Sequence, residues 1–196
     1  MTEHPGSGRK LRAYLGLGSN TGDSAGILRR AVDELSTMFD DPRVSSFYRT
    51  RPRDDVKQPD FLNAVFSGVT DKEALEVLRI VQILEEKSGR RRDPDRPKGP
   101  RTLDIDILLY GDLRIYGPEL EIPHPRMRER KFVLVPLLEL DPLVREPATG
   151  IYYGEYAAKL EDQGIYYISL NHYSTTLSWE DRAEGYGSKY GNQRKQ

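Results

Sequence analysis

Segments with two different hydrophobic periods alternate along this chain, and their order restricts the folds that it can adopt. Strand-like patterns cover about residues 12–18, 43–50, 61–70 and 103–109, and helical patterns cover about residues 24–39 and 71–88. In the second helical stretch, Leu75, Leu78 and Val81 recur at helical spacing, which predicts an apolar stripe packed on a sheet. The order strand, helix, strand, strand, helix, strand predicts an α+β fold of the ferredoxin-like type, an antiparallel sheet with the two helices on one face.

The length of 196 residues is sufficient for one domain with its own core, which we predict over residues 11–161. Residues 1–10 are polar and contain glycine, which is typical of a flexible tail. Residues 162–196 form a C-terminal extension. Its apolar part, Ile165–Ile168, is expected to add a strand or a self-association contact, and its polar end, Gly185–Gln196, is expected to be disordered. We expect a monomer unless this extension mediates self-association.

The charge balance and the residue types of the chain exclude several classes of protein. With 30 basic and 31 acidic residues the net charge is −1, so nucleic acid is not an expected partner. The absence of cysteine excludes disulfides and thiolate metal sites. The sequence has neither an apolar run of membrane-spanning length nor a signal-peptide pattern. We therefore expect a soluble, cytoplasmic protein with no membrane partner.

Two aspartates stand two residues apart in the otherwise apolar segment Leu103–Tyr110. Because side chains alternate between the faces of a strand, Asp104 and Asp106 are predicted on one face and Leu103, Ile105 and Ile107 on the other. Aspartate is disfavoured in strands, so its repetition favours a functional role. Mg²⁺ relieves repulsion between neighbouring carboxylates and typically uses one or two of them together with substrate phosphates. The pair therefore predicts a magnesium site and phosphate chemistry; the alternative is a solvated strand face with two unrelated acids.

An arginine-rich loop precedes these aspartates. Residues 89–101 contain six basic residues, five of them arginine, and two acidic ones, with proline and glycine throughout. Arginine donates paired hydrogen bonds that suit phosphate oxygens, and mobile basic loops often close over phosphates. We predict an anion-binding loop, for which a solvated run of charges is the alternative.

Three further motifs are ambiguous on their own. Leu11–Asn20 is typical of a strand that runs into a glycine turn, but it matches neither a Walker loop nor a dinucleotide fingerprint, and glycine backbone angles explain it equally well. Phe61 and Asn63 are predicted on one strand face, where an aromatic ring and an amide can bind a flat heterocycle; the alternative is an ordinary core position. His124 lies between two prolines and before an arginine cluster, and is either structural or a phosphate contact.

Taken together, these segments resemble the 6-hydroxymethyl-7,8-dihydropterin pyrophosphokinase family, enzymes of folate biosynthesis that transfer pyrophosphate from ATP to a pterin alcohol. The resemblance covers about residues 11–160 and includes, in family order, Tyr14–Asn20, Ser45–Thr50, Gln58–Ala64, Gly99–Asp106, Ile122–Pro125 and Pro136–Leu137. The Gly-Pro-Arg-Thr-Leu-Asp-Ile-Asp sequence of residues 99–106 is its most specific element. The resemblance implies the ferredoxin-like fold, ATP as co-substrate and a pterin as substrate.

The resemblance also implies roles for individual residues at the ATP site. Asp104 and Asp106 are expected to hold two Mg²⁺ ions. Other residues that match family positions for the nucleotide or its phosphates are Gln82, Glu85, Arg90, Arg92, Arg101, Ile107, His124 and Arg130. We assign Arg90 and Arg101, with the two aspartates, to the catalytic group.

Pterin-site positions of the family are matched by Thr50, Arg53, Phe61, Asn63 and Phe132. Three residues depart from the family pattern. Arg53 stands where an apolar residue often lines the pterin site, Phe61 replaces a frequent tyrosine, and Lys98 occupies the region of a tryptophan that often caps the closed site. None of them removes a metal ligand or a triphosphate-binding arginine, so activity is expected.

The implied reaction is attack of the pterin hydroxymethyl oxygen on the β-phosphorus of ATP, with AMP as the leaving group. Catalysis of such a transfer relies on alignment and charge neutralisation, and Asp106 is our candidate proton acceptor. Two alternatives stay open from the sequence. A two-metal nucleotidyltransferase would release pyrophosphate, and a non-catalytic paralogue would bind nucleotide or pterin without turnover.

Overall fold

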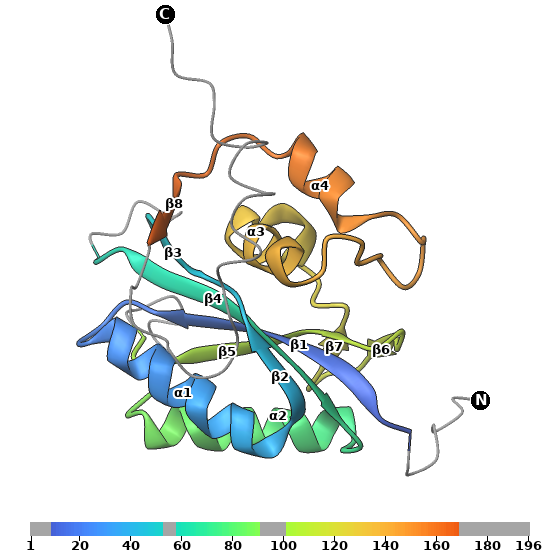
Figure 1. Cartoon of the computed structure of the whole chain (residues 1–196), viewed down its shortest axis with the longest axis horizontal. Coiled ribbons are helices and arrows are strands. Elements are labelled where there is room, and N and C mark those ends of the chain that lie inside the picture. The colour runs from blue at the N-terminus through green and yellow to red at the C-terminus, as the bar shows by residue number, and fades with distance from the viewer. Residues whose placement is uncertain (1–8, 53–57, 91–100, 169–196) are drawn as a thin grey trace, which may run out of the picture.

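The structure is a computed structural model that describes residues 9–52, 58–90 and 101–168 (Figure 1). The elements that match the predicted pattern are β1 (Leu11–Ser19), α1 (Ser24–Met38), β2 (Asp40–Val44), β3 (Phe47–Thr50), β4 (Phe61–Thr70), α2 (Ala74–Lys87) and β5 (Asp104–Tyr110). They are followed by β6 (Ile115–Tyr116), β7 (Glu121–Ile122), a 3-10 helix (Met127–Glu129), α3 (Lys131–Leu140), α4 (Tyr153–Lys159) and β8 (Ile165–Ile168). The predicted α+β class is confirmed.

Six of the described strands form one sheet, in the order β5-β1-β4-β3-β8 with β2 also paired to β4, and β6 and β7 form a separate two-stranded sheet. All strand pairs of the six-stranded sheet are antiparallel, and the order β5-β1-β4-β3 is the ferredoxin-like arrangement. Within this register, Gly18 of β1 pairs with Asn63 of β4 on one side and with Asp104 of β5 on the other. β1 therefore lies between the two strands that carry predicted site residues.

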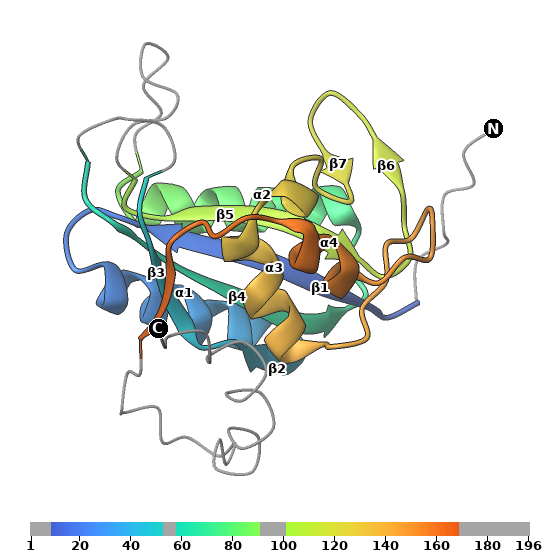
Figure 2. The ribbon, with the colours of Figure 1, turned by 90° about the horizontal axis from the view of Figure 1, so that it is seen from above.

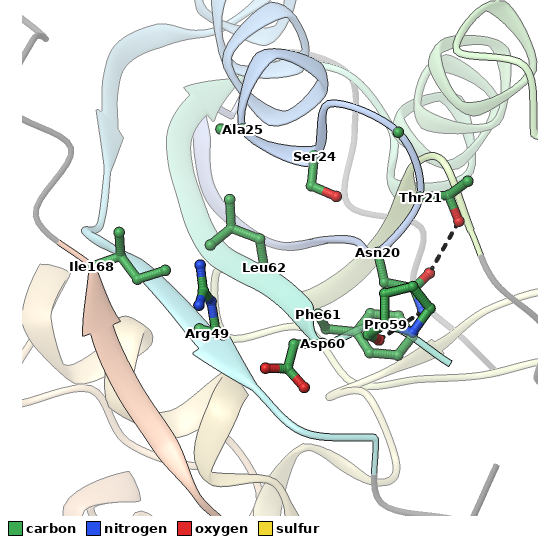
Figure 3. Close-up of a pocket in the computed structure, with 11 residues that line it drawn as sticks. Asn20, Thr21, Ser24, Ala25, Arg49, Pro59, Asp60, Phe61, Leu62 and Ile168 are labelled. Carbon is green, nitrogen blue, oxygen red and sulfur yellow. Dashed lines mark hydrogen bonds between the residues drawn. The ribbon is translucent and has the colours of Figure 1, made fainter. Parts of the chain in front are cut away.

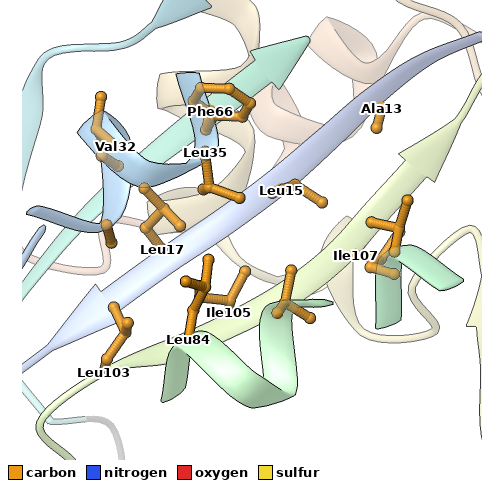
Figure 4. Packing of buried hydrophobic residues seen from close by; sticks show 14 of the residues in the cluster. Ala13, Leu15, Leu17, Val32, Leu35, Phe66, Leu84, Leu103, Ile105 and Ile107 are labelled. Atoms are coloured by element: carbon orange, nitrogen blue, oxygen red, sulfur yellow. The ribbon is translucent and has the colours of Figure 1, made fainter. Parts of the chain in front are cut away.

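The two predicted helices, α1 and α2, pack on the same face of the sheet (Figure 1). Leu15 of β1 and Leu35 of α1 have no exposed surface, and Ile105 of β5 and Leu84 of α2 are nearly as buried. Figure 4 shows these side chains meeting between the sheet and the helices. Because burial of one such side chain contributes about 1.5–3 kcal/mol, this layer is a main source of stability.

The opposite face of the sheet is covered by α3 and α4, which the sequence patterns did not predict (Figures 1 and 2). Tyr14, Val65, Leu134, Leu137 and Tyr153 form a second buried cluster there. The segment of α3 is apolar around most of its circumference and contains a proline, so it lacks the helical period that revealed α1 and α2.

Residues 43–50 form two strands in place of the single predicted strand. β2 ends at Val44, and the next residue, Ser45, bonds to both sides of one β4 residue: its N donates to Val65 O at 2.9 Å and its Oγ accepts from Val65 N at 2.9 Å. The backbone N of Ser46 turns away from β4 toward a carboxylate of α3. A hydrogen bond to a side chain therefore replaces one backbone hydrogen bond between the strands.

The C-terminal extension adds a strand to the sheet, β8, and this was one of the two roles predicted for it. It pairs antiparallel with β3, with Ile165 opposite Thr50 and Ile168 opposite Phe47. The predicted disordered end, Gly185–Gln196, and the first eight residues lie outside the described residues. Within the described ranges, no helix combines the length and apolar character needed to cross a membrane.

Candidate active site

The two aspartates project from β5 as alternation requires. Ile105 and Ile107 of the same strand are 5% and 4% exposed in the core, whereas Asp104 and Asp106 stand on the face that α3 covers. Gly18 opens space beside them, since a Cβ built on it would lie 3.4 Å from Asn63 Oδ1 and 3.9 Å from Asp104 Cβ. Asn63 and Asp104, which are predicted to bind different substrates, are therefore neighbours across β1.

Asp104 is held by two arginines at the edge of the sheet. Arg90 Nη1 lies 2.7 Å from its Oδ1, and Arg101 Nη1 pairs with its Oδ2. Arg90 also pairs with Glu85, a carboxylate that is only 4% exposed and accepts a 2.8 Å hydrogen bond from Ile105 N. Glu85 thus joins the end of α2 to β5 and keeps Arg90 beside Asp104. The structure brings these four predicted residues together.

Asp106 has looser partners than Asp104. His124 Nε2 and Arg130 Nη1 each lie 3.7 Å from its Oδ2, and 41% of its side chain is exposed. Burial of the carboxyl group, and then repulsion from Asp104, raises the pKa of Asp106, which the nearby cations oppose. The Asp106 carboxylate therefore has the greater freedom to take a new ligand.

His124 is oriented by its own backbone. The backbone N–H of His124 donates to Leu108 O at 2.9 Å, and the ring Nδ1 accepts from the backbone N of Arg126 at 3.2 Å. Because Nδ1 accepts, the neutral ring carries its proton on Nε2, the atom that faces Asp106. Burial lowers the pKa of His124, against the attraction of Asp106. The neutral imidazole is therefore a donor directed at the site.

The predicted pterin residues begin on β3 and β4. Asn63 Nδ2 donates to Thr50 Oγ1 at 2.8 Å, and both side chains are buried. Phe61 is paired with Thr50 and lies two residues before Asn63, so it belongs to the same face. Phe132 lies in the first turn of α3, with the Arg130 guanidinium 5.5 Å from the centre of its ring.

Asn20 holds two parts of the site together, a role that sequence reasoning did not assign. The side chain is 2% exposed; its Oδ1 accepts from Arg101 N at 2.7 Å and its Nδ2 donates to Gln58 Oε1 at 3.2 Å. Arg101 O in turn accepts from Asn20 N at 3.0 Å. The Gly-Ser-Asn end of the β1 motif was the available signal, but its partners are distant in sequence.

A cavity of about 640 Å³ lies beside the turn that leads into α1. Asn20, Thr21, Arg49, Asp60 and Phe61 are among the residues that line it (Figure 3). Among the described residues that were predicted for the site, Phe61 borders this cavity together with Asn20, and the aspartates do not. The site is therefore defined by the charged groups over β5 and β1, and not by this cavity.

Of the remaining predicted residues, three are not described and two lie away from this cluster. Arg53, Arg92 and Lys98 lie outside the described residues. Gln82 is half-buried on α2, and Ile107 lies in the core on the face opposite the aspartates. Within residues 9–52, 58–90 and 101–168, no group of three or more histidine, cysteine or carboxylate side chains forms a ready metal cage.

An α+β fold that gathers paired carboxylates, arginines and an oriented histidine over one sheet face is a candidate phosphate-transfer enzyme. The sequence model of the family described as 7,8-dihydro-6-hydroxymethylpterin-pyrophosphokinase (HPPK) matches residues 14–142, more than half of the chain. The chain belongs to this family.

Individual relatives agree with the family match. A 2-amino-4-hydroxy-6-hydroxymethyldihydropteridine pyrophosphokinase of Methylorubrum extorquens is 42% identical over 160 residues, which cover 79% of this chain and 96% of that protein. The enzyme of the same name from Bacillus subtilis is 42% identical over 140 residues, covering 70% of this chain and 83% of the relative.

Other relatives are much longer than this chain. The folic acid synthesis protein fol1 of Pneumocystis carinii is 36% identical over 153 residues, which cover 78% of this chain and 20% of that protein. The wild-type HPPK-DHPS structure of Plasmodium falciparum is 15% identical with a TM-score of 0.62, covering 77% of this chain and 45% of that chain. This likeness supports the fold.

Proposed function

We propose that this chain transfers pyrophosphate from ATP to the hydroxymethyl group of 6-hydroxymethyl-7,8-dihydropterin, giving the pterin diphosphate and AMP in folate biosynthesis. Membership of the pyrophosphokinase family supports this reaction. The observation that carries it is local: Asp104, framed by Arg90 and Arg101, lies across Gly18 from Asn63. One sheet face thus offers groups for a polyphosphate next to groups for a heterocycle.

The carboxylates are suited to Mg²⁺. The two side chains leave β5 on one face, and Mg²⁺ needs only one or two protein carboxylates when substrate phosphates complete its shell. We propose that Asp104 and Asp106 hold two such ions, which would shield the phosphates and increase the acidity of the attacking hydroxyl.

We propose that the cations around the aspartates bind the triphosphate. Arg90 and Arg101 now neutralise Asp104, and Arg130 and His124 face Asp106. With divalent cations on the carboxylates, these four side chains would become available as donors to phosphate oxygens. Arg92, from the adjoining loop, is assigned to the same group.

We propose that the pterin lies against β4. The Asn63 amide and the Thr50 hydroxyl are buried polar groups that can bond to the edge of a heterocycle, and Phe61 and Phe132 supply aromatic surfaces. Asp106, which leaves β5 on the same face, is the proposed acceptor of the hydroxyl proton.

The test is product analysis with Mg²⁺, ATP and the pterin alcohol. We expect AMP and pterin diphosphate in equal amounts, loss of both in Asp104→Asn, and wild-type rates in Asp112→Asn. Asp112 lies two residues after the end of β5 and is exposed, so its variant removes a nearby carboxylate without touching the site. Pyrophosphate release would indicate a nucleotidyltransferase, and ligand binding without products would indicate a non-catalytic paralogue.

A further inference from the structure

Glu139 lies in the last turn of α3, and its carboxylate accepts hydrogen bonds from the segment that leads into β3. Ser46 donates to Oε1 twice, from its N at 3.0 Å and from its Oγ at 2.8 Å. Tyr48 Oη donates to Oε2 at 2.8 Å. Hydrogen bonds to a charged acceptor are stronger than those between neutral groups, so this cluster is a strong link between helix and sheet.

The residues that Glu139 holds are next to the proposed pterin residues. Tyr48 is paired with Asn63 across β3 and β4, and Thr50, two residues further, accepts the hydrogen bond from Asn63. Burial, together with the nearby charge of Glu139, raises the pKa of Tyr48, which keeps its hydroxyl protonated as a donor. The position of β3 relative to β4 therefore sets the distance between Thr50 and Asn63.

The same helix carries an aromatic group of the proposed site. Phe132 lies in the first turn of α3 and Glu139 in the last, so a single rigid element joins them. α3 lies over β3 and β4 (Figure 1). A change in the bond between Glu139 and β3 would alter the spacing between the helix that carries Phe132 and the strands that carry Thr50 and Asn63.

We propose that Glu139 is a positioning residue for the pterin, acting through Tyr48 and Ser46. The proposal rests on the proposed function of the chain. Glu139 holds β3 and α3 at the spacing that a flat heterocycle requires, whereas the groups proposed for ATP are anchored elsewhere, Arg101 by Asn20 and Arg90 by Glu85. Loss of the Glu139 bonds should therefore weaken pterin binding and leave ATP binding unchanged.

A second bond of the same kind supplies a matched control. Tyr14 Oη on β1 donates to Asp141 Oδ2 at 2.7 Å, immediately after α3. Tyr14→Phe and Tyr48→Phe each remove one tyrosine hydroxyl that bonds a carboxylate at the C-terminal end of α3. They differ in the strand that they release, and only Tyr48 belongs to the strand of Thr50.

The experiment compares Tyr48→Phe, Glu139→Gln and Tyr14→Phe by steady-state kinetics, equilibrium pterin binding without Mg²⁺, and thermal unfolding. We expect KM and Kd for the pterin to rise about three- to tenfold in Tyr48→Phe and Glu139→Gln, the fold-change that corresponds to one lost hydrogen bond, with KM for ATP unchanged. Tyr14→Phe should lose similar stability and keep wild-type values for the pterin.

Equal pterin constants in Tyr48→Phe and Tyr14→Phe would overturn the proposal, as would a parallel rise in the KM for ATP. If Glu139→Gln does not fold, the tyrosine pair still decides the question. An inactive wild-type chain would instead contradict the proposed function, and pterin binding by the same three variants would still test Glu139.

Discussion

The two sheet faces at β1 and β5 have different roles, although successive side chains of each strand alternate between them. Toward α1 and α2, Leu15 and Ile105 pack into an apolar layer. Toward α3, glycines of β1 stand beside Asp104 and Asp106, and charged groups approach from the strand edge. One strand therefore supplies both core and site, so adjacent substitutions should separate stability from activity.

The largest expected effect is the contrast between Asp104 and its neighbour. Asp104→Asn should reduce kcat/KM by about a thousandfold or more, because it removes a metal-binding charge from the site. Ile105→Ala should cost about 2–5 kcal/mol of unfolding free energy, while the folded fraction keeps nearly full activity. Denaturant unfolding and initial rates measure the two effects, and similar activity losses in both variants would contradict the division between faces.

Removal of an arginine that touches Asp104 should have the next largest effect. Arg90→Ala and Arg101→Ala should each reduce kcat/KM about ten- to a hundredfold, the value of one charge-assisted hydrogen bond of about 1.5–3 kcal/mol. Arg91→Ala and Arg96→Ala, in the same loop, are the matched controls and should change the rate little. Equal losses at all four positions would favour a general effect of positive charge.

Asn20→Ala should have a smaller effect on the same region. It leaves the partly buried N–H of Arg101 without its acceptor, which costs about 1–3 kcal/mol of stability, and it frees Arg101 to move. We expect the KM for ATP to rise about fivefold, less than in Arg101→Ala. Isothermal titration with a non-hydrolysable ATP analogue measures the change. Unaltered affinity for the analogue would show that Asn20 does not contribute to the ATP site.

The smallest effect concerns the pH dependence of stability without metal or nucleotide. The pKa of Asp106 is raised in the folded protein above its ordinary value of 3.8. Such a group adds stability that is fully present below the unfolded pKa and is lost as pH rises through the folded pKa. Asp106→Asn should therefore raise the melting temperature at neutral pH and lose this advantage in acid. An advantage that is larger in acid would reverse the sign of the shift.

The part of the fold that was predicted is the part with a clear period. α1 and α2 have apolar stripes, and β5 alternates between carboxylates and core residues. α3 has no such contrast because most of its residues are apolar and Pro136 interrupts the pattern. β6 and β7 have two residues each, too few to show any period.

The same distinction applies to the site. The spacing of Asp104 and Asp106 fixes their common face, and this prediction was confirmed. Asn20 and Arg101 are 81 positions apart in the sequence, and Ser46 and Glu139 are 93 positions apart. No local pattern reveals contacts at such separations. The break between β2 and β3 was missed for this reason, since it depends on the bonds of Ser45 to Val65 on β4 and of Ser46 to Glu139 on α3.

The proposed transfer is tested most directly by following the β-phosphate of ATP. The proposed reaction moves the β- and γ-phosphates together, so ATP labelled at the β-phosphate should give labelled pterin diphosphate and unlabelled AMP. The label should stay in ATP when Asp104→Asn replaces the wild-type chain. Label recovered in ADP or in free pyrophosphate would contradict pyrophosphoryl transfer to the pterin.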